Sequence, residues 1–217
     1  MKTFFAQFQI SKVIKRLILV DLIFWSGWGL LAPIFAVFLI QKIEGATLAV
    51  VGLASGIYWV LKSLLVLPIG IFLDSKRGEE DDFWFLFFGL ILNSLVPFGY
   101  LMAKVPFHIY LLEALHALGV AMSTAAWGSL FTKHVDEGKE ATEWSLENTS
   151  VGLGVGICGV LGGMVAQVFG FKVVFLLVGF CGILAALLVL ATLKFLFPKS
   201  FKKGSLFSLK GIFQKER

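Results

Sequence analysis

The chain has 217 residues, of which 58% are hydrophobic and 15% are charged, and its formal net charge is +5. A soluble domain averages about 45–50% apolar and about 25% charged residues, so an ordinary soluble domain is excluded. The basic residues lie between and beyond long apolar stretches rather than on one continuous face, so we expect no nucleic-acid partner.

Six apolar segments are each long enough to cross a bilayer, which takes about 20 mostly apolar residues. They cover residues 17–40, 47–73, 83–103, 107–131, 146–169 and 172–196. The sequence therefore predicts an all-α membrane protein with a six-helix bundle at residues 17–197. The first segment is too long for the core of a signal peptide, and we expect it to be retained. No soluble domain or large loop is expected.

The two ends of the chain, residues 1–16 and 198–217, combine basic side chains with Phe, Leu and Ile. This composition predicts amphipathic segments that lie along an anionic inner leaflet. A frayed basic tail is the alternative. Both ends are expected on the cytoplasmic side.

The basic residues predict the orientation of the bundle. Fifteen fall in the two ends and in the loops after the second and fourth segments: Lys2, Lys12, Lys15, Arg16, Lys76, Arg77, Lys133, Lys139, Lys194, Lys199, Lys202, Lys203, Lys210, Lys215 and Arg217. Three fall on the other side: Lys42, Lys104 and Lys172. Because basic loops stay inside, a multi-pass protein with cytoplasmic termini is predicted, in a bacterial plasma membrane.

Charged residues inside the apolar segments are candidates for function, because charges are costly in lipid. Asp21 lies one turn into the first segment, with Trp25 and Trp28 following on the same helix face. Lys62 lies near the middle of the second segment. The alternatives are that Asp21 reaches the headgroups and that Lys62 makes a structural ion pair.

The loop after the second segment has the most distinctive pattern in the chain. Pro68 precedes Gly70, Asp74 follows Gly70 by four residues, and Lys76, Arg77 and Gly78 come next. Asp74 is expected to end the helix at the membrane surface, where a carboxylate can accept hydrogen bonds from a helix N-terminus. Lys76 and Arg77 would hold the loop at the anionic leaflet, and Gly78 would allow the turn into the third segment.

The fourth segment carries Glu113 and His116, which are three residues apart and therefore on one face. A buried Glu beside a His is suited to carrying a proton near neutral pH. The alternative is a local hydrogen-bonded pair. Glu143, Glu147 and Asn148 are predicted to cap the fifth segment. Asn93 and Ser94 in the third are predicted to contribute to packing and to helix–helix hydrogen bonds.

The loop pattern from Gly70 to Gly78 resembles the signature loop between helices two and three of the major facilitator superfamily. The resemblance covers nearly the whole chain. Residues 55–70 resemble the second helix of that family, and a glycine-rich fifth segment resembles the fifth: Gly152, Gly154, Gly156, Gly159, Gly162 and Gly163. Gly163, Gln167 and Gly170 echo the loop pattern, as two three-helix repeats of inverted topology would.

Two departures from the family's patterns bear on the substrate. The fourth segment has no Arg ahead of its glycine at Gly119, and Cys158-Gly159 stands where proton antiporters carry Gly-Pro. The resemblance thus implies the fold and the transport class, and drug–proton antiport is not supported by these motifs.

The resemblance also implies two groups of site residues. The residues that would line a central cavity for substrate or proton are Asp21, Trp25, Trp28, Glu113 and His116. The residues that would form a conformational latch and a packing surface for the opposite half are Lys62, Gly70, Asp74, Lys76, Arg77 and Gly78. We expect no catalytic residue, no cofactor and no metal site.

Members of this family have two six-helix halves, and the chain has the helices of one. We therefore predict a transporter of a small solute that works by alternating access as a homodimer, with proton coupling as an option. One alternative is half of a heteromer with a second six-helix chain. Another is a scaffold or lipid-handling protein that does not transport. A membrane enzyme is not expected, because His and Cys residues are few and scattered.

Overall fold

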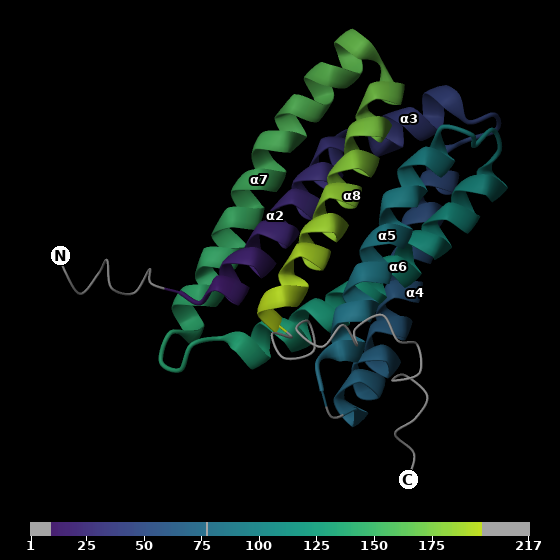
Figure 1. Cartoon of the computed structure of the whole chain (residues 1–217). Coiled ribbons are helices and arrows are strands. Elements are labelled where there is room, and N and C mark those ends of the chain that lie inside the picture. The colour runs from purple at the N-terminus through teal and green to yellow at the C-terminus, as the bar shows by residue number, and fades with distance from the viewer. Residues whose placement is uncertain (1–9, 77, 197–217) are drawn as a thin grey trace.

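The computed structural model describes residues 10–76 and 78–196, with side chains up to residue 193, and these residues form helices joined by short loops (Figure 1). The elements in chain order are α2 (Lys12–Leu31), the short 3₁₀ helix η1 (Ala32–Ile34), α3 (Phe35–Lys42), α4 (Leu48–Ser75), α5 (Glu80–Tyr100), α6 (Pro106–His134), α7 (Glu140–Phe169) and α8 (Phe171–Leu196). The first span runs through α2, η1 and α3, so the described residues contain six spans of membrane-crossing length.

The six predicted spans are confirmed, with differences at their ends. The first helix begins at Lys12, five residues early, because the Ser11 hydroxyl caps it by accepting from the backbone N–H of Ile14 at 3.2 Å. Pro33 lies in η1, which interrupts this span. The fifth begins at Glu140 rather than residue 146, since its first turns are polar and hydropathy alone misses them. The predicted amphipathic ends lie outside the described residues, apart from residues 10–16.

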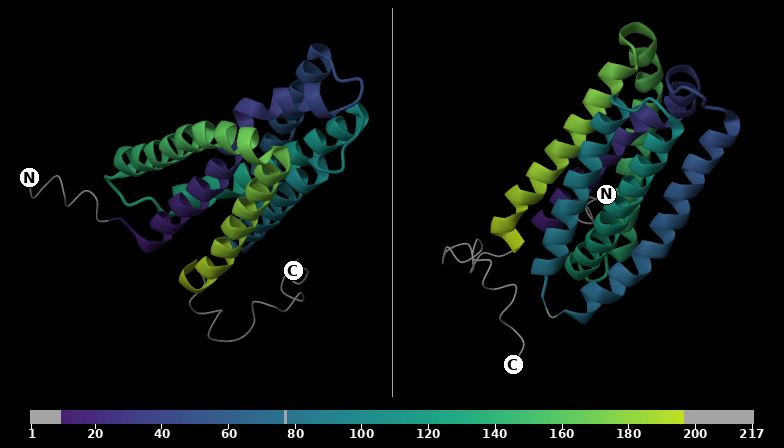
Figure 2. Two further views of the ribbon diagram at one scale, coloured as in Figure 1. Left: turned by 90° about the horizontal axis from the view of Figure 1, so that it is seen from above. Right: turned by 90° about the vertical axis from the view of Figure 1, so that its right-hand side faces the viewer.

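The helices pack as two groups of three (Figures 1 and 2). α2 packs between α7 and α8, and α6 packs between α4 and α5. The first helix of each sequence triplet thus packs with the second and third helices of the other triplet. The third helices, α5 and α8, pack on each other and join the groups. This exchange is the arrangement expected of two inverted three-helix repeats.

The second helices of the two repeats, α4 and α7, lie at opposite edges of the bundle (Figure 1). They are the least buried spans, with 6% of their central residues buried against 39–50% in the others. Large apolar side chains point outward from α4 (Leu53, Val60, Leu64, Leu67 and Ile71) and from α7 (Leu153, Ile157, Val160, Leu161, Met164 and Val168). We call the side of the bundle that lies between α4 and α7, and that is formed by α2 and α6, the open face.

Glycines let the helices of each group approach closely. A Cβ at Gly29 of α2 would lie 2.9 Å from the Cα of Val155 in α7, and a Cβ at Gly162 of α7 would overlap the backbone of Leu30. Membrane helices gain their stability from such close packing, because lipid offers no hydrophobic drive between helices. The α2–α7 contact therefore depends on glycine at these positions.

Asn93 and Ser94 were predicted to pack and to form hydrogen bonds between helices. Both side chains do pack on a neighbouring helix, at Gly119 and Gly182, but the hydrogen-bond part of the prediction is wrong. The Asn93 amide donates to the carbonyl of Gly89 at 2.9 Å and the Ser94 hydroxyl to that of Leu90 at 2.6 Å, both one turn back in α5. Asn93 still contributes to packing, since its amide lies directly over Gly119 of α6. Both hydrogen bonds thus run inside α5, and the buried Oδ1 of Asn93 has no hydrogen-bond partner among the described residues.

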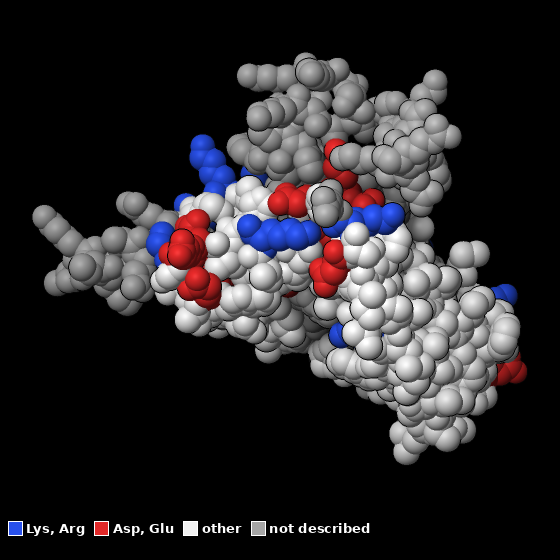
Figure 3. All heavy atoms as spheres, turned by 90° about the horizontal axis from the view of Figure 1, so that it is seen from below, with Lys and Arg blue, Asp and Glu red and all other residues white. Residues whose placement is uncertain are grey.

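Charged side chains gather at the end of the bundle where α2 begins and α8 ends, which we call the terminal end (Figure 3). Lys133, near the end of α6, binds the buried carboxylate of Asp82 in α5 at 2.5 Å. His134, at the end of α6, lies 3.6 Å from Glu79, which lies in the loop between α4 and α5. These contacts fix the loop between α4 and α5 against α6, and Gly78 turns there with φ 151°, a conformation that favours glycine.

We predict that Gly162→Ala destabilises the bundle, because the added methyl group meets the backbone of Leu30 and forces α2 and α7 apart. The expected loss is about 1–3 kcal/mol in the free energy of unfolding, measured by denaturant titration in mixed micelles. Gly128→Ala in α6 is the matched control, since a Cβ there has no neighbour within 4 Å. Equal losses in the two variants would contradict the packing described.

Candidate functional site

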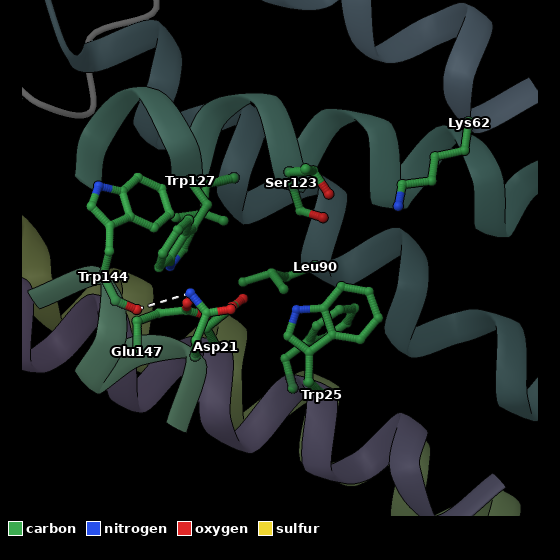
Figure 4. Close-up of a pocket in the computed structure, with 12 residues that line it drawn as sticks. Asp21, Trp25, Lys62, Leu90, Ser123, Trp127, Trp144 and Glu147 are labelled. Carbon is green, nitrogen blue, oxygen red and sulfur yellow. Dashed lines mark hydrogen bonds between the residues drawn. The ribbon is translucent and has the colours of Figure 1, made fainter. Parts of the chain in front are cut away.

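A polar cavity of about 220 Å³ opens on the open face (Figure 4). It is lined by residues from five helices: Asp21, Phe24 and Trp25 of α2; Lys62 of α4; Leu86 and Leu90 of α5; Ser123, Thr124 and Trp127 of α6; and Trp144, Glu147 and Asn148 of α7. α2 and α6 provide its middle and α4 and α7 its sides. A cavity that contains two carboxylates, an ammonium and two hydroxyls at the depth of the membrane spans is costly unless it serves function.

Two carboxyl groups meet in this cavity. Asp21 of α2 and Glu147 of α7 both line the cavity, and their carboxyl groups lie side by side (Figure 4). Glu147 is 7% exposed. Since two neighbouring carboxylates repel each other, this carboxyl pair holds either a shared proton or a cation when both groups stay in contact.

Three indole rings surround the carboxyl pair. The Trp127 N–H donates to the carbonyl of Leu17 at 3.2 Å, which fixes the ring against α2. Trp144 meets Trp127 edge to face, with 5.9 Å between ring centroids. Trp25 lies on the other side of the pair (Figure 4). The cavity thus combines negative charge with aromatic surface.

Lys62 of α4 lines the same cavity, on the side away from the carboxyl pair (Figure 4). Its ammonium lies 4.7 Å from the centroid of the Trp59 ring. Among the described residues it makes no ion pair within 4.0 Å. The sequence placed Lys62 with the latch and interface residues, and that role stays a prediction.

A second polar cluster lies beside the cavity. The Tyr100 hydroxyl of α5 donates to the Glu113 carboxylate of α6 at 2.8 Å, and both groups are buried. His116 Nδ1 lies 3.6 Å from the other Glu113 oxygen, which is too long for a direct hydrogen bond. Neither nitrogen of His116 has a hydrogen-bond partner among the described residues.

His116 is held between two aromatic rings. Trp28 of α2 stacks on one face of the imidazole, with centroids 3.8 Å apart, and Tyr58 of α4 stacks on the other at 4.5 Å. Tyr58 lies one turn before Lys62, so α4 connects this cluster to the cavity. We call Trp28, Tyr58, Tyr100, Glu113 and His116 the histidine cluster.

The five predicted cavity residues are therefore divided between two places. Asp21 and Trp25 line the cavity, whereas Trp28, Glu113 and His116 belong to the histidine cluster. The described residues contain no group of three or more His, Cys, Asp or Glu side chains that could hold a metal ion.

The residues of the signature loop lie apart from the cavity, at the terminal end. α4 ends at Ser75, one residue after Asp74. Asp74 and Lys76 are exposed, and a Cβ at Gly70 would have no neighbour within 4 Å. Arg77 lies outside the described residues. Within one copy, the predicted latch residues are thus available for an external contact, and their role stays a prediction.

Sequence reasoning missed half of the site. Glu147 and Asn148 were predicted to cap α7, which is wrong, because the helix begins at Glu140 and Glu147 lies two turns inside it. Trp127, Trp144, Tyr58 and Tyr100 were not singled out. The available signal was the four-residue spacing of Glu143 and Glu147, which continues the helix upstream of its apolar part.

Comparison with known proteins agrees with this architecture. Residues 17–210 match the family described as Major Facilitator Superfamily. The chain belongs to the major facilitator superfamily. It is 25% identical over 162 residues to a protein of Methanocaldococcus jannaschii named as an uncharacterized MFS-type transporter. That match covers 75% of this chain and 40% of the relative, so the chain spans less than half of the relative's length.

Membership in the superfamily explains why six spans, an internal repeat and a polar cavity occur together. The chain is an integral, multi-pass membrane protein that corresponds in size to a half-length member. The family groups transporters rather than enzymes. The position of α4 and α7 at the edges of the open face follows from the internal repeat, because each is the second helix of its repeat.

We predict that Tyr100→Phe lowers the stability of the bundle by about 1.5–3 kcal/mol, because the buried Glu113 carboxylate loses its hydrogen-bond donor. The measurement is a double-mutant cycle with Glu113→Gln, using the unfolding midpoint in mixed micelles. If the two changes prove additive, the Tyr100–Glu113 bond does not contribute to stability.

Proposed function

We propose that this protein is a secondary-active transporter of a small solute that works by alternating access as a homodimer. The observation that carries the proposal is the polar cavity on the open face, lined by one bundle and flanked by two helices whose apolar sides are exposed. In a transporter of this family such a cavity lies between two bundles. One bundle alone would turn these charges toward lipid, which is costly.

The flanking helices suit a second bundle. Glycines face outward on both: Gly52 and Gly56 on α4, and Gly152, Gly156 and Gly163 on α7, each with no atom within 4 Å of an added Cβ. Small residues four apart allow membrane helices to approach closely. Together with the large apolar side chains around them, they form surfaces that favour a helical partner over lipid.

A second copy of the same chain supplies the matching surfaces. α4 and α7 are equivalent positions of the internal repeat, so a twofold axis along the membrane normal pairs α4 of each copy with α7 of the other. The two cavities would then face each other across that axis. A distinct six-helix chain is the alternative partner, which the cross-linking experiment below distinguishes.

The signature loop would act as the latch of this assembly. In the proposed dimer the exposed Asp74 approaches the N-terminal end of the partner's α7, where the helix dipole attracts a carboxylate. Lys76 and Arg77 stay at the headgroups, and Gly70 allows close approach. Release of this contact would accompany opening of the cavity at the terminal end.

Proton coupling is the use we propose for the histidine cluster. Glu113 and His116 are both titratable and buried, and the imidazole nitrogens have no fixed partner among the described residues. A water molecule or a small movement can join the two groups at 3.6 Å. A pH-sensitive dye inside vesicles tests this: solute-driven proton flux should disappear in Glu113→Gln and persist in the exposed Glu80→Gln.

The proposed membrane is the bacterial plasma membrane, with the terminal end in the cytoplasm. The supporting observation is the concentration of basic side chains at that end (Figure 3). Anionic inner-leaflet lipids are the proposed partners of the two basic chain ends.

We predict that Leu64→Cys on α4 cross-links to Leu153→Cys on α7 only when the two changes are on separate copies of the chain. Both side chains are exposed and lie near the middle of their helices. The copies carry different tags and lack Cys158 and Cys181, and the disulfide-linked dimer is measured on a non-reducing gel. Leu184→Cys on α8 is the matched control and should not react. Equal reaction of the control, or linkage only to another protein, would contradict the homodimer.

Alternating access predicts that Thr124→Cys in the cavity reacts with an impermeant maleimide from either side of the membrane. Right-side-out and inside-out vesicles of the cysteine-free variant provide the measurement, and buried Ala185→Cys should stay unlabelled. Asp74→Asn should change the ratio of the two labelling rates several-fold while the dimer persists. Labelling from one side only would argue against transport, and an unchanged ratio would argue against the latch.

A further inference from the structure

We propose that the cavity on the open face is a binding site for a small organic ammonium ion. The carboxyl pair would neutralise its charge, and Trp25, Trp127 and Trp144 would contact its alkyl or methyl groups. The site names the solute class of the transporter proposed above, and its role in transport rests on that proposal. Binding itself can be measured independently.

The charge of the cavity selects a cation. Asp21 and Glu147 come from different helices and line a space that also contains Lys62, so the cavity carries one more negative than positive charge when both carboxyl groups are ionised. A bound cation would take the place of the proton that the pair otherwise shares. Lys62 does not neutralise the pair, because its ammonium lies over Trp59 and no ion pair within 4.0 Å joins it to either carboxylate among the described residues. One monovalent cation therefore balances the cavity, whereas an anion would be repelled by the pair.

The aromatic surface distinguishes an organic cation from a metal ion. Alkylammonium groups bind the faces of indole rings with about 0.5–2 kcal/mol each, and Trp is the best partner. Three indoles line the same cavity as the carboxyl pair, and Trp127 is fixed in place by its bond to Leu17. A hydrated metal ion would gain nothing from these rings and prefers a shell of oxygen ligands.

The size of the cavity limits the solute. At about 220 Å³ it lies below the roughly 300–1,000 Å³ that is usual for drug-sized ligands. A quaternary or simple primary amine of a few carbon atoms fits this space. Ser123 and Thr124 line the cavity on the α6 side and offer hydroxyls to a polar group at the far end of such a solute.

Choline, glycine betaine and dimethylbutanol form a suitable set of probes, because they share one branched head. Choline carries a positive charge there, dimethylbutanol is its neutral carbon isostere, and betaine adds a carboxylate. Binding to the full chain in lipid nanodiscs is measured by calorimetry. We expect choline to bind at least tenfold more tightly than either analogue. Equal binding of dimethylbutanol, or tighter binding of betaine through Lys62, would overturn the proposal.

Variants of the carboxyl pair identify the charge partners. Asp21→Asn and Glu147→Gln should each weaken choline binding at least tenfold. Glu80→Gln is the matched control, since it makes the same change on an exposed carboxylate in the first turn of α5 and should leave the affinity unchanged. Unchanged affinity in both pair variants would overturn the assignment.

A variant of the aromatic surface keeps the proposal testable if Asp21→Asn or Glu147→Gln fails to fold. Trp144 is 38% exposed, whereas Glu147 is 7% exposed, so replacing the indole disturbs the interior less than replacing Glu147 does. Trp144→Leu should weaken choline several-fold without changing dimethylbutanol binding, and Trp144→Phe should restore part of the loss. Equal effects on both probes would show a merely apolar contact and count against the site.

Failure of this site and failure of the transporter proposal give different results. Two-sided labelling of Thr124→Cys with no preference for choline would leave the transporter and remove the cation site. Choline binding that depends on Glu147, together with labelling from one side only, would keep the site and remove transport.

Discussion

A charged group inside a bilayer must be paired, neutralised or turned away from lipid, and this constraint determines how the bundle can exist. The open face presents Asp21, Glu147 and Lys62 at the depth of the membrane spans. Within one copy, the two carboxyl groups lie side by side and repel each other when both are ionised, whereas Lys62 has an aromatic partner. Full compensation requires a cover over the cavity. The exposed apolar sides of α4 and α7 are where such a cover would attach, so the cavity and the flanking helices have one explanation.

The exchange of helices between the two three-helix repeats determines which helices meet at the cavity. Because α2 packs with α7 and α8 while α6 packs with α4 and α5, each side of the cavity combines segments that are distant in sequence. Glu147 lies beside Asp21 on a helix contact in which Gly154, Gly29 and Gly162 let α7 approach α2 closely. The histidine cluster joins α2, α4, α5 and α6 in the same way. A charge change at the carboxyl pair therefore acts on a contact between helices, which is the kind of change that can alter packing.

The fold was predictable because hydropathy and the Gly70–Gly78 pattern are local signals. Six spans, the repeat and the family followed from them, and the break at Pro33 and the early start of α7 did not, since apolar content does not report helix ends. The site was only partly predictable. Asp21, Lys62, Glu113 and His116 were found because each is a polar residue within an apolar run. Glu147 lies at the polar start of such a run, where the sequence predicts a cap. The Trp residues gain significance only once α2, α6 and α7 are placed together.

The measurement that tests the central claim most directly is the native mass of the full chain, purified alone and held in lipid nanodiscs. The account predicts a particle with twice the mass of one chain, in which two cavities face each other. A particle with the mass of a single chain, stable in lipid and with the sides of α4 and α7 accessible to lipid-phase probes, would contradict it.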